Sequence, residues 1–396
     1  MSTQLSERTE SGVTGSTPFI DEAEDRSVGS VDERLEAADE RFYYANPWKL
    51  IMWRFRRHRL AMISLVVLVL LYTVALFAEF VSPYTATWRA EGLQMMPPTK
   101  IHVFHEGSLH RPFVYGLEKT LDQETFKYIF TEDTSTPYPI LFFTQGVEYK
   151  MWGQWPMSIH LFGTGLDAPP VMLFGSDQLG RDIFSRTIYG SRISLSIGLF
   201  GVLISFMIGI AIGGISGYFG GTTDELIQRM IDVIISIPLI PFWMALSAAL
   251  PRTWTSTQTF LAITLILAAV TWTGLARVVR GKLLALREED YALAAQVAGA
   301  SKSRIIFRHL MPGFTSHLIV SVTLAIPVAI LGETALSFLG LGIQPPAVSW
   351  GVLLQDGQDL VAVAQQPWRL IPALFVIGTV LLFNFVGDGL RDAADP

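Results

Sequence analysis

Residues 288–312 read EEDYALAAQVAGASKSRIIFRHLMP and are the one long polar interruption among otherwise apolar segments. The pattern predicts two short helices, Tyr291–Ala298 and Lys302–Leu310, around a turn. Gly299 is placed to form a left-handed C-terminal cap, Ser301 to cap the second helix, and Pro312 to end it. Small side chains leave one side of the first helix with little bulk: Ala292, Ala294, Ala295 and Ala298. The segment is either a well-capped connector or a surface on which another protein docks.

The composition places this segment in a multi-span membrane protein. Of the 396 residues, 50% are hydrophobic and 16% are charged. Several apolar runs have the length of about 20 residues that a transmembrane helix needs, which excludes a soluble enzyme. The chain has no cysteine, so it can form neither a disulfide nor a thiolate metal site.

The net charge of −6 originates near the N-terminus. Residues 1–45 contain eleven Asp or Glu and four Arg, which leaves the remainder with a charge of +1. This leader has no spaced apolar face to offset the entropy lost on ordering, so we expect it to be disordered. From residue 46, aromatic and apolar residues alternate with cationic ones, which predicts a helix on the membrane surface.

Six apolar runs follow, and each is expected to be a transmembrane helix. The cationic segment before the first run places the N-terminus in the cytoplasm, and six crossings return the C-terminus there. Residues 288–312 and the arginines around them then also lie in the cytoplasm. The expected spans are Leu60–Val81, Ile193–Gly214, Ile231–Leu250, Phe260–Val279, Ser316–Leu336 and Leu370–Phe385.

Glycine and proline positions predict how these spans pack and bend. Gly209, Gly213 and Gly217 fall on one helical face and favour close packing within the chain, with a contact to a partner subunit as the alternative. Prolines that would each remove a backbone hydrogen bond and bend a span are Pro238, Pro241 and Pro327. Glu333 lies near the outer end of the fifth span, where it either faces the pore, reaches the interface or pairs with a partner.

Residues 82–175, between the first two spans, are too long and too aromatic for a plain loop and predict a small extracytoplasmic domain of mixed structure. We expect strands at Ile101–Phe104, Pro139–Phe143 and Val147–Trp152, and a helix at Leu121–Phe130. In a strand, His102 and His105 would face opposite sides and could not hold one ion together, so no metal site is expected.

Residues 174–195, FGSDQLGRDIFSRTIYGSRISL, form a second motif. Ser176 or Asp177 would cap an interfacial helix in which Asp182 and Arg186 stand at i and i+4. The motif resembles the segment before the second span in permeases of the dipeptide, oligopeptide and nickel branch of ABC importers. The resemblance rests on Asp177, Gly180, Arg181, Asp182, Arg186 and Arg192, with Ser176 in place of a common Thr.

Residues 332–351, GETALSFLGLGIQPPAVSWG, resemble the same branch, as does the C-terminal stretch from Pro367. Gly340 and Gly342 would end the fifth span, and the following prolines predict a partly re-entrant segment with Trp350 at the outer interface. The candidates for the pore or its gate are Glu333, Gly340, Gly342 and Pro327.

With these motifs in place, residues 288–312 resemble the EAA loop of ABC importer permeases, the cytoplasmic segment that seats in a cleft of the ATP-hydrolysing subunit. Leu293 stands where the name-giving Glu is found, so no role can rest on that Glu. His309 and Met311 also depart from the family pattern. The expected docking residues are Ala294, Ala295, Gly299, Ser301, Arg304, Arg308 and Pro312.

The resemblance covers residues 46–82 and 175–396 and implies an all-α polytopic permease. Such a chain would pair with a second permease, two ATPase subunits and an extracytoplasmic solute-binding protein in the bacterial inner membrane. Peptides are the favoured cargo, while nickel, opines and oligosaccharides stay open. The expected parts are a leader (1–45), an interfacial helix with the first span (46–81), an extracytoplasmic domain (82–175) and a permease core (176–396).

The alternatives of another class are a membrane-embedded enzyme and a scaffold. An enzyme would need a nucleophile beside a base, and the spans contain no such pair. The chain also lacks a GxxxxGK[ST] phosphate loop, so ATP is expected to bind elsewhere. We therefore expect no catalytic residue, no cofactor and no nucleic-acid partner.

Overall fold

The computed structural model describes residues 47–121, 123, 128–251 and 253–394, and the expected leader lies outside them. The chain divides into two units, Met1–Trp53 and Arg54–Pro396. Of the first unit the structure describes only residues 47–53, which begin helix α2 (Pro47–Arg57), the helix predicted from residue 46. The second unit contains all the other described elements.

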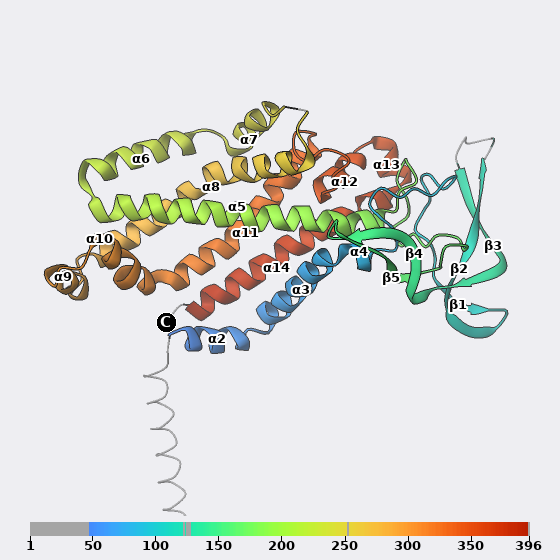
Figure 1. The fold of residues 1–396 in the computed structure, drawn as a ribbon, viewed down its shortest axis with the longest axis horizontal. Helices are drawn as coiled ribbons and strands as arrows, with labels where there is room; N and C mark the ends of the chain where they lie inside the picture. The colour runs from blue at the N-terminus through green and yellow to red at the C-terminus, as the bar shows by residue number, and fades with distance from the viewer. Residues whose placement is uncertain (1–46, 122, 124–127, 252, 395–396) are drawn as a thin grey trace, which may run out of the picture. The chain divides into compact units, whose positions relative to one another are not determined.

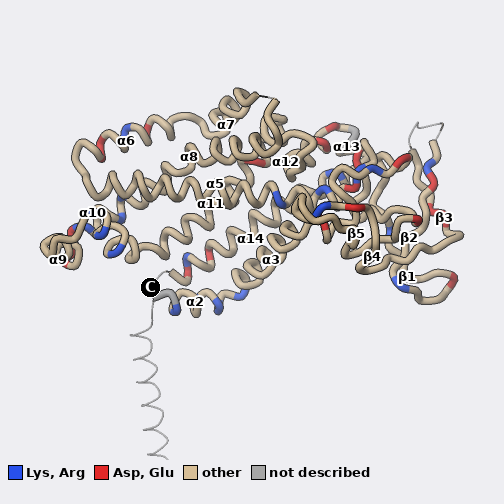
Figure 2. Tube along the Cα trace, in the orientation of Figure 1, with Lys and Arg blue, Asp and Glu red and all other residues tan. Residues whose placement is uncertain are grey.

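Five described helical segments are long and apolar enough to cross a membrane, and each overlaps a predicted span. Charged residues lie mainly toward the ends of these segments (Figure 2). The segments are α3 (Arg59–Leu76), α5 (Ile183–Phe219), α8 (Ser256–Leu286), Lys302–Phe338, which ends in α11 (Thr315–Phe338), and Pro367–Ala394, which contains α14 (Ile371–Ala394).

The third predicted span is broken in two. Helices α6 (Gly221–Ser236) and α7 (Leu239–Ala248) meet at a bend of 83°. Pro238 stands immediately before α7, where its missing N–H interrupts the helical ladder. The described residues therefore contain five candidate spans, or six if the bent pair counts as one.

Glycines bring α5 close to α8, as predicted for packing within the chain. A Cβ at Gly217 would lie 2.8 Å from the carbonyl oxygen of Arg280. One at Gly209 would lie 3.0 Å from a leucine side chain of α8, and one at Gly213 would clash with the backbone of Ala276. The helix face with these glycines is thus occupied by α8 and is not free for a partner.

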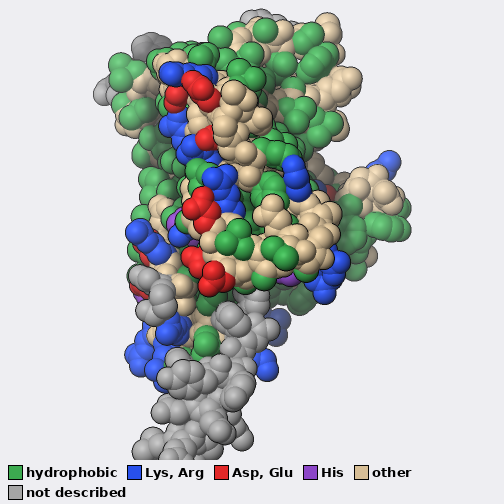
Figure 3. Space-filling view, turned by 90° about the vertical axis from the view of Figure 1, so that its left-hand side faces the viewer, with side chains coloured by type: hydrophobic (Ala, Val, Ile, Leu, Met, Phe, Trp, Pro, Cys, Tyr) green, Lys and Arg blue, Asp and Glu red, His purple; other side chains and the backbone are tan. Residues whose placement is uncertain are grey.

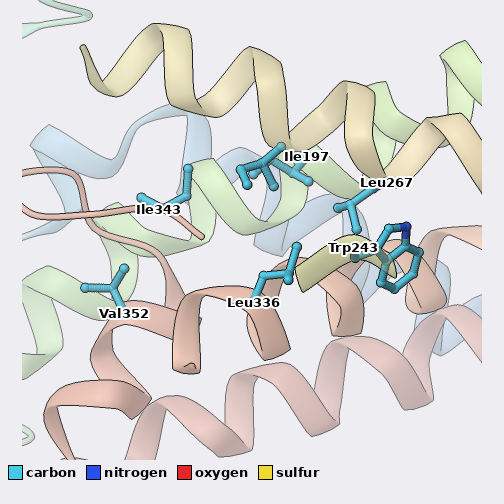
Figure 4. Close-up of a cluster of buried hydrophobic side chains, with 7 residues drawn as sticks. Ile197, Trp243, Leu267, Leu336, Ile343 and Val352 are labelled. Carbon is cyan, nitrogen blue, oxygen red and sulfur yellow. The ribbon is translucent and has the colours of Figure 1, made fainter. Parts of the chain in front are cut away.

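A buried apolar cluster joins helices that are distant in sequence (Figure 4). Its members are Ile197, Trp243, Ile263, Leu267, Leu336, Ile343 and Val352. Ile343 belongs to the predicted re-entrant segment, which continues into α12 (Trp350–Asp356), the helix that contains Val352, and α13 (Leu360–Gln365) follows. The Trp350 side chain does not face lipid, because it is fully buried and its indole N–H donates to the Thr187 carbonyl at 3.1 Å. Its position at the level of the outer interface stays a prediction.

The described residues between α4 (Ala78–Val81) and α5 form strands and contain no α-helix. Strands β1 (His102–His105), β2 (Ser108–Leu121) and β3 (Tyr128–Pro139) make an antiparallel sheet, and β4 (Leu141–Met151) pairs with β5 (Trp155–Gly163). At both ends of the helix predicted at Leu121–Phe130 the structure has strands instead: Leu121 pairs with Tyr128, and sheet pairing overrides the local helix preference. Residues 122 and 124–127 of this prediction lie outside the described residues. Figure 1 shows these strands at the opposite end of the long helices from residues 290–304.

His102 and His105 lie on the same side of β1, contrary to the prediction. A register shift after His102 breaks the strand alternation, and both imidazole rings contact Tyr115. His102 Nε2 lies 3.2 Å from the Glu132 carboxylate, and His105 Nδ1 lies 2.9 Å from the Tyr115 hydroxyl. Within the described ranges, no group of three or more His, Cys, Asp or Glu could hold a metal ion.

Candidate functional site

The polar interruption folds as two helical pieces around a capped turn, as predicted. Helix α9 spans Asp290–Val297, and the N–H groups of Gly299 and Ala300 each donate to a carbonyl of its last turn at 3.0 Å, in a Schellman arrangement. Gly299 has a φ of +79°, the left-handed conformation that favours glycine. Ser301 then caps α10 (Lys302–Arg304) by accepting a hydrogen bond from the last N–H of that helix at 3.4 Å.

The second helical piece does not end at Pro312, contrary to the prediction. After α10 the backbone forms a π-helical turn at Ile305–Leu310 and a 3-10 turn at Met311–Phe314, and it then enters α11 directly. Pro312 has no N–H to donate to the carbonyl of Arg308, and the helix accommodates this by changing its hydrogen-bond spacing instead of stopping. The loop is therefore continuous with a candidate membrane-spanning helix.

The alanine side of α9 partly faces this chain, which changes the predicted surface. Ala292 is 2% exposed and packs with Leu283 of α8 and with Ile305, and Ala295 packs against the same cluster. By contrast, Val297 is 90% exposed. The other large apolar side chains that this loop exposes, each by about half, are Tyr291, Leu293 and Phe307.

Charged and apolar side chains lie next to each other at this end of the molecule (Figure 3). Apart from Ala295, the predicted docking residues are all exposed: Ala294, Gly299, Ser301, Arg304, Arg308 and Pro312. A hollow of about 320 Å³ lies beside them, with Arg287, Leu293 and Lys302 among its lining residues. The Lys302 ammonium group lies 4.7 Å from the ring centre of Phe219. The surface offers backbone, cationic and apolar groups together, which suits a protein partner.

The motif at 174–195 does not form a separate interfacial helix. Neither Ser176 nor Asp177 caps a helix; α5 begins at Ile183, and Asp182 is its N-cap, accepting from the Ser185 N–H at 2.8 Å. Asp182 is 2% exposed. Desolvation by this burial raises the pKa of Asp182 from 3.8 to about 7, although the hydrogen bonds from Ser185 act in the opposite direction.

Four charged residues around this motif form a network in which Asp177 and Arg186 are buried and Arg181 and Asp356 are partly exposed. Arg186, which is 1% exposed, donates to Asp177 at 2.5 Å and to Asp356 at 3.1 Å. Arg181 donates to the same two carboxylates at 2.6 and 3.4 Å. The i,i+4 pair predicted between Asp182 and Arg186 is not formed, because Asp182 caps the helix instead. The network fastens the start of α5 to the end of α12.

Gly180 and Arg192 complete the positions predicted for this motif. Gly180 has a φ of +74°, and a Cβ there would lie 2.6 Å from the Ala90 carbonyl oxygen. Arg192 donates to both carboxylate oxygens of Glu79, at 2.7 and 2.6 Å. It also donates to two carbonyls of the last turn of α3, one of them of Leu76 at 2.9 Å. Arg192 therefore binds α5 to the end of α3.

Glu333 is enclosed by its own chain. The side chain is fully buried, and its carboxylate accepts from Ser194 of α5 at 2.9 Å and from Ser337 of α11 at 2.8 Å. The same two hydroxyl oxygens accept the N–H groups of Trp350 at 3.1 Å and Ile343 at 3.0 Å. This network joins α5, α11 and the re-entrant segment, so the Glu333 side chain points into the protein between these three elements.

The other pore candidates shape the end of α11. The helix ends at Phe338, and Gly340 follows with a φ of +75°, as predicted for a break. A Cβ at Gly342 would overlap the backbone of Ser337, so only glycine fits there. Pro327 is buried within α11. A contact between any of these residues and cargo stays a prediction.

Sequence reasoning missed several residues of these networks. Asp356 and Ser194 lie more than 100 positions from their partners, so no local spacing could reveal them. Glu79 follows an apolar run without any capping pattern. Val297 had a local signal, since it is a β-branched apolar residue two positions before the capping Gly299. In these networks the carboxylates of Asp356 and Glu79 are paired with arginines of this chain, and Ser194 donates a hydrogen bond to the carboxylate of Glu333.

The long apolar helices, the broken span and the polar loop define a membrane-spanning component of a transport system. A family profile described as binding-protein-dependent transport system inner membrane component matches residues 209–396. A second profile, described as the N-terminal TM domain of oligopeptide transport permease C, matches residues 46–98.

Individual relatives agree with these matches. The oligopeptide transport system permease protein OppC of Bacillus subtilis is 33% identical over 350 residues, which cover 88% of this chain and 89% of that protein. The dipeptide transport system permease protein DppC of the same organism is 43% identical over 225 residues, 56% of this chain and 68% of that protein. The chain belongs to the family of binding-protein-dependent inner membrane transport components, and it is a permease subunit and not an enzyme.

A solved structure was also matched. A chain of the methionine ABC transporter MetNI in an inward-facing conformation aligns with a TM-score of 0.40 at 17% identity. The alignment covers 52% of this chain and 96% of that one.

Proposed function

We propose that this chain forms half of the pore of an ATP-driven importer for peptides. The names of its relatives, oligopeptide and dipeptide permeases, support a peptide cargo. A second permease would form the other half, two ATPase subunits would bind residues 288–312, and an extracytoplasmic binding protein would deliver the cargo. One observation supports the transmission of force best: the capped loop runs without a break from Lys302 into α11, which ends at Phe338.

The proposed mechanism follows from this continuity. Closure of the ATPase pair would displace α9 and α10, and the π-helical and 3-10 turns would pass the displacement to α11 as one body. At the far end of α11, Glu333 and Ser337 hold the re-entrant segment and α5. A movement at the loop would therefore reach the segment that we expect to close the pore.

The proposed topology counts the bent pair α6–α7 as one span, giving six crossings. Both termini and the loop 288–312 then lie in the cytoplasm, and the strands between α4 and α5 lie outside. The cationic residues at the loop, Arg287, Lys302, Arg304 and Arg308, support this orientation through the positive-inside rule.

Val297→Asp tests the docking role directly. Val297 is 90% exposed, so a carboxylate there is tolerated by the isolated chain but would be desolvated beneath an ATPase subunit. We expect peptide uptake and co-purification of the ATPase to be lost while membrane insertion is unchanged. Val297 is a better position than Ala295, because Ala295 packs against this chain and its replacement by Glu would disturb the loop itself.

The matched control is Leu109→Asp, which is 73% exposed at the opposite end of the molecule. This variant should retain the ATPase. Uptake and ATPase association at the wild-type level in Val297→Asp would overturn the docking role. Competition of labelled-peptide uptake by unlabelled peptides, Ni²⁺ and oligosaccharides would test the cargo separately.

A further inference from the structure

The hairpin β4–β5 exposes four large aromatic side chains. Phe142 is 69% exposed and Phe143 67%, while Trp155 is 55% and Trp152 44% exposed. A group of exposed aromatic side chains marks a surface that binds a partner or a membrane. We propose that this hairpin rests on the bilayer, with these four side chains among the lipid headgroups at the level where α3 ends.

Contacts fix the hairpin at the end of α3. The indole N–H of Trp152 donates to the Leu76 carbonyl at 2.8 Å, and its ring lies 5.7 Å from that of Phe77. At the other end of the hairpin, the ring of Phe143 lies 6.1 Å from that of Phe80. Figure 1 shows β4 and β5 beside α4, directly after α3.

The length of α3 sets the depth of this contact. Its 18 residues correspond to about 27 Å, close to the thickness of about 30 Å of the hydrocarbon core of a bilayer. The helix begins at Arg59, next to further basic residues at 54, 56 and 57. With Arg59 at one interface, Leu76 reaches the other. Trp152 then lies at the depth where tryptophan is enriched in membrane proteins, with its ring in the apolar zone and its N–H hydrogen-bonded.

The apolar surface is continuous from α3 to the hairpin. Along α3, Ile63, Val66 and Leu70 are each 61% exposed, and Leu76 is 52% exposed. The next exposed ring, Phe77, contacts Trp152, which in turn contacts Trp155. Because the exposed side of a membrane-spanning helix faces lipid, a surface that continues it at the interface meets the same lipid. This continuity favours a lipid partner over a second protein.

The backbone of the hairpin is bent to present these rings. Phe143 and Trp152 have φ values of +53° and +50°, an uncommon conformation for bulky residues. The pairing register also shifts between Gln145 and Tyr149, which curves the hairpin. The two residues with positive φ are also the ones that contact the end of α3 and α4: Trp152 contacts Phe77, and Phe143 contacts Phe80. The unusual backbone therefore occurs at the two points where the hairpin is attached.

Spin labelling tests this proposal on the full chain, because the chain has no native cysteine. Phe142→Cys and Trp155→Cys would each carry a nitroxide in the assembled transporter, reconstituted in phosphatidylethanolamine–phosphatidylglycerol nanodiscs. Neither side chain has a hydrogen bond that the substitution would remove. Power-saturation measurements with oxygen, which partitions into lipid, and with a water-soluble nickel chelate give the accessibility ratio at each position. We expect a ratio several-fold higher than at Leu109→Cys, a 73% exposed apolar position on the β1–β3 sheet.

Two outcomes would overturn the proposal. Equal accessibility ratios at the hairpin and at Leu109 would place the hairpin in water. Labels that are immobile and shielded from both reagents, and that become accessible when another subunit is removed, would show that a protein covers the hairpin. If a cysteine variant fails to assemble, brominated lipids provide a second measurement: the unmodified chain should show tryptophan quenching that Trp155→Phe reduces, and equal quenching would contradict the lipid contact.

Discussion

The two ends of the long helices differ in whether their side chains are paired within the chain or exposed. At one end, Asp177, Arg181, Arg186 and Asp356 are paired with one another, and Arg186 is 1% exposed. At the other end, residues 288–312 are well capped but leave Val297 90% exposed beside exposed arginines. At the first end, these four charged side chains find their partners within this chain. The second has an ordered backbone but an uncovered surface, which is the arrangement expected of a docking element.

The largest expected effect of a single substitution lies in the paired end. Asp177→Ala removes a buried carboxylate that binds both Arg181 and Arg186, and it leaves two arginines facing one remaining carboxylate. Breaking a buried ion pair in this way costs about 3–5 kcal/mol, so we expect a large drop in the thermal unfolding midpoint in detergent. Asp232→Ala is the control, because its pair with Arg277 is about half exposed and should contribute about 0–1 kcal/mol. If the unfolding midpoint fell equally in the two variants, the buried ion pair would contribute no more stability than the exposed one.

Glu333→Leu should have the next largest effect. The substitution leaves the hydroxyls of Ser194 and Ser337 without their buried acceptor, at a cost of about 1–3 kcal/mol per unsatisfied group. Glu333→Gln keeps an acceptor oxygen and should lose less. Unfolding in detergent measures both. A variant with unchanged stability but altered cargo preference would instead place Glu333 in the pore.

At the docking end, Gly299→Ala should have a smaller effect on stability. A Cβ at Gly299 meets no atom within 4 Å, so only the φ of +79° opposes the substitution, at about 1–2 kcal/mol. Gly274→Ala is the matched control: its Cβ also has open space, but the residue lies in α8 with no positive φ. The control should be neutral or stabilising by about 0.5–1 kcal/mol. Similar changes in both variants would mean that the turn is not held in the left-handed conformation.

The remaining prediction is a pH dependence at the paired end. The pKa of Asp182 is raised by burial from 3.8 to about 7, so the folded protein binds a proton more tightly than the unfolded chain. The associated stability is fully present below pH 3.8 and is lost as the pH rises through about 7. Asp182→Asn keeps the N-cap acceptor but does not titrate. Unfolding midpoints between pH 4 and 7.5 should therefore fall more steeply for the wild type, and parallel curves would refute the shift.

Local patterns predicted local structure well. The left-handed Gly299, the Ser301 cap and the break at Gly340 depend on residues within one turn of one another, and the structure confirms all three. The apolar runs likewise predicted the long helices. Pro312 shows the limit of such rules, because tertiary packing around Phe314 and Leu318 carries the helix past a residue that would normally end it.

Features that depend on distant residues were not predictable. The choice of Asp182 over Ser176 as the cap of α5 follows from Ser176, whose hydroxyl donates to the Leu93 carbonyl and accepts the Met96 N–H. The burial of Ala292 follows from its place in a cluster that also contains Leu318 of α11. In each case a partner far along the chain decides the outcome, and a single sequence does not show which partner that is.

The central claim, that residues 288–312 receive the ATPase, is tested most directly by photocrosslinking from Val297→Cys. Because the chain has no native cysteine, a benzophenone maleimide would label the purified chain at this position alone before it is assembled with the other subunits, with Leu109→Cys as the control at the opposite end. We expect a crosslink from position 297 to an ATPase subunit in membranes that contain the whole transporter, and none from position 109. A crosslink to the ATPase from position 109, or one from position 297 to the extracytoplasmic binding protein, would contradict it.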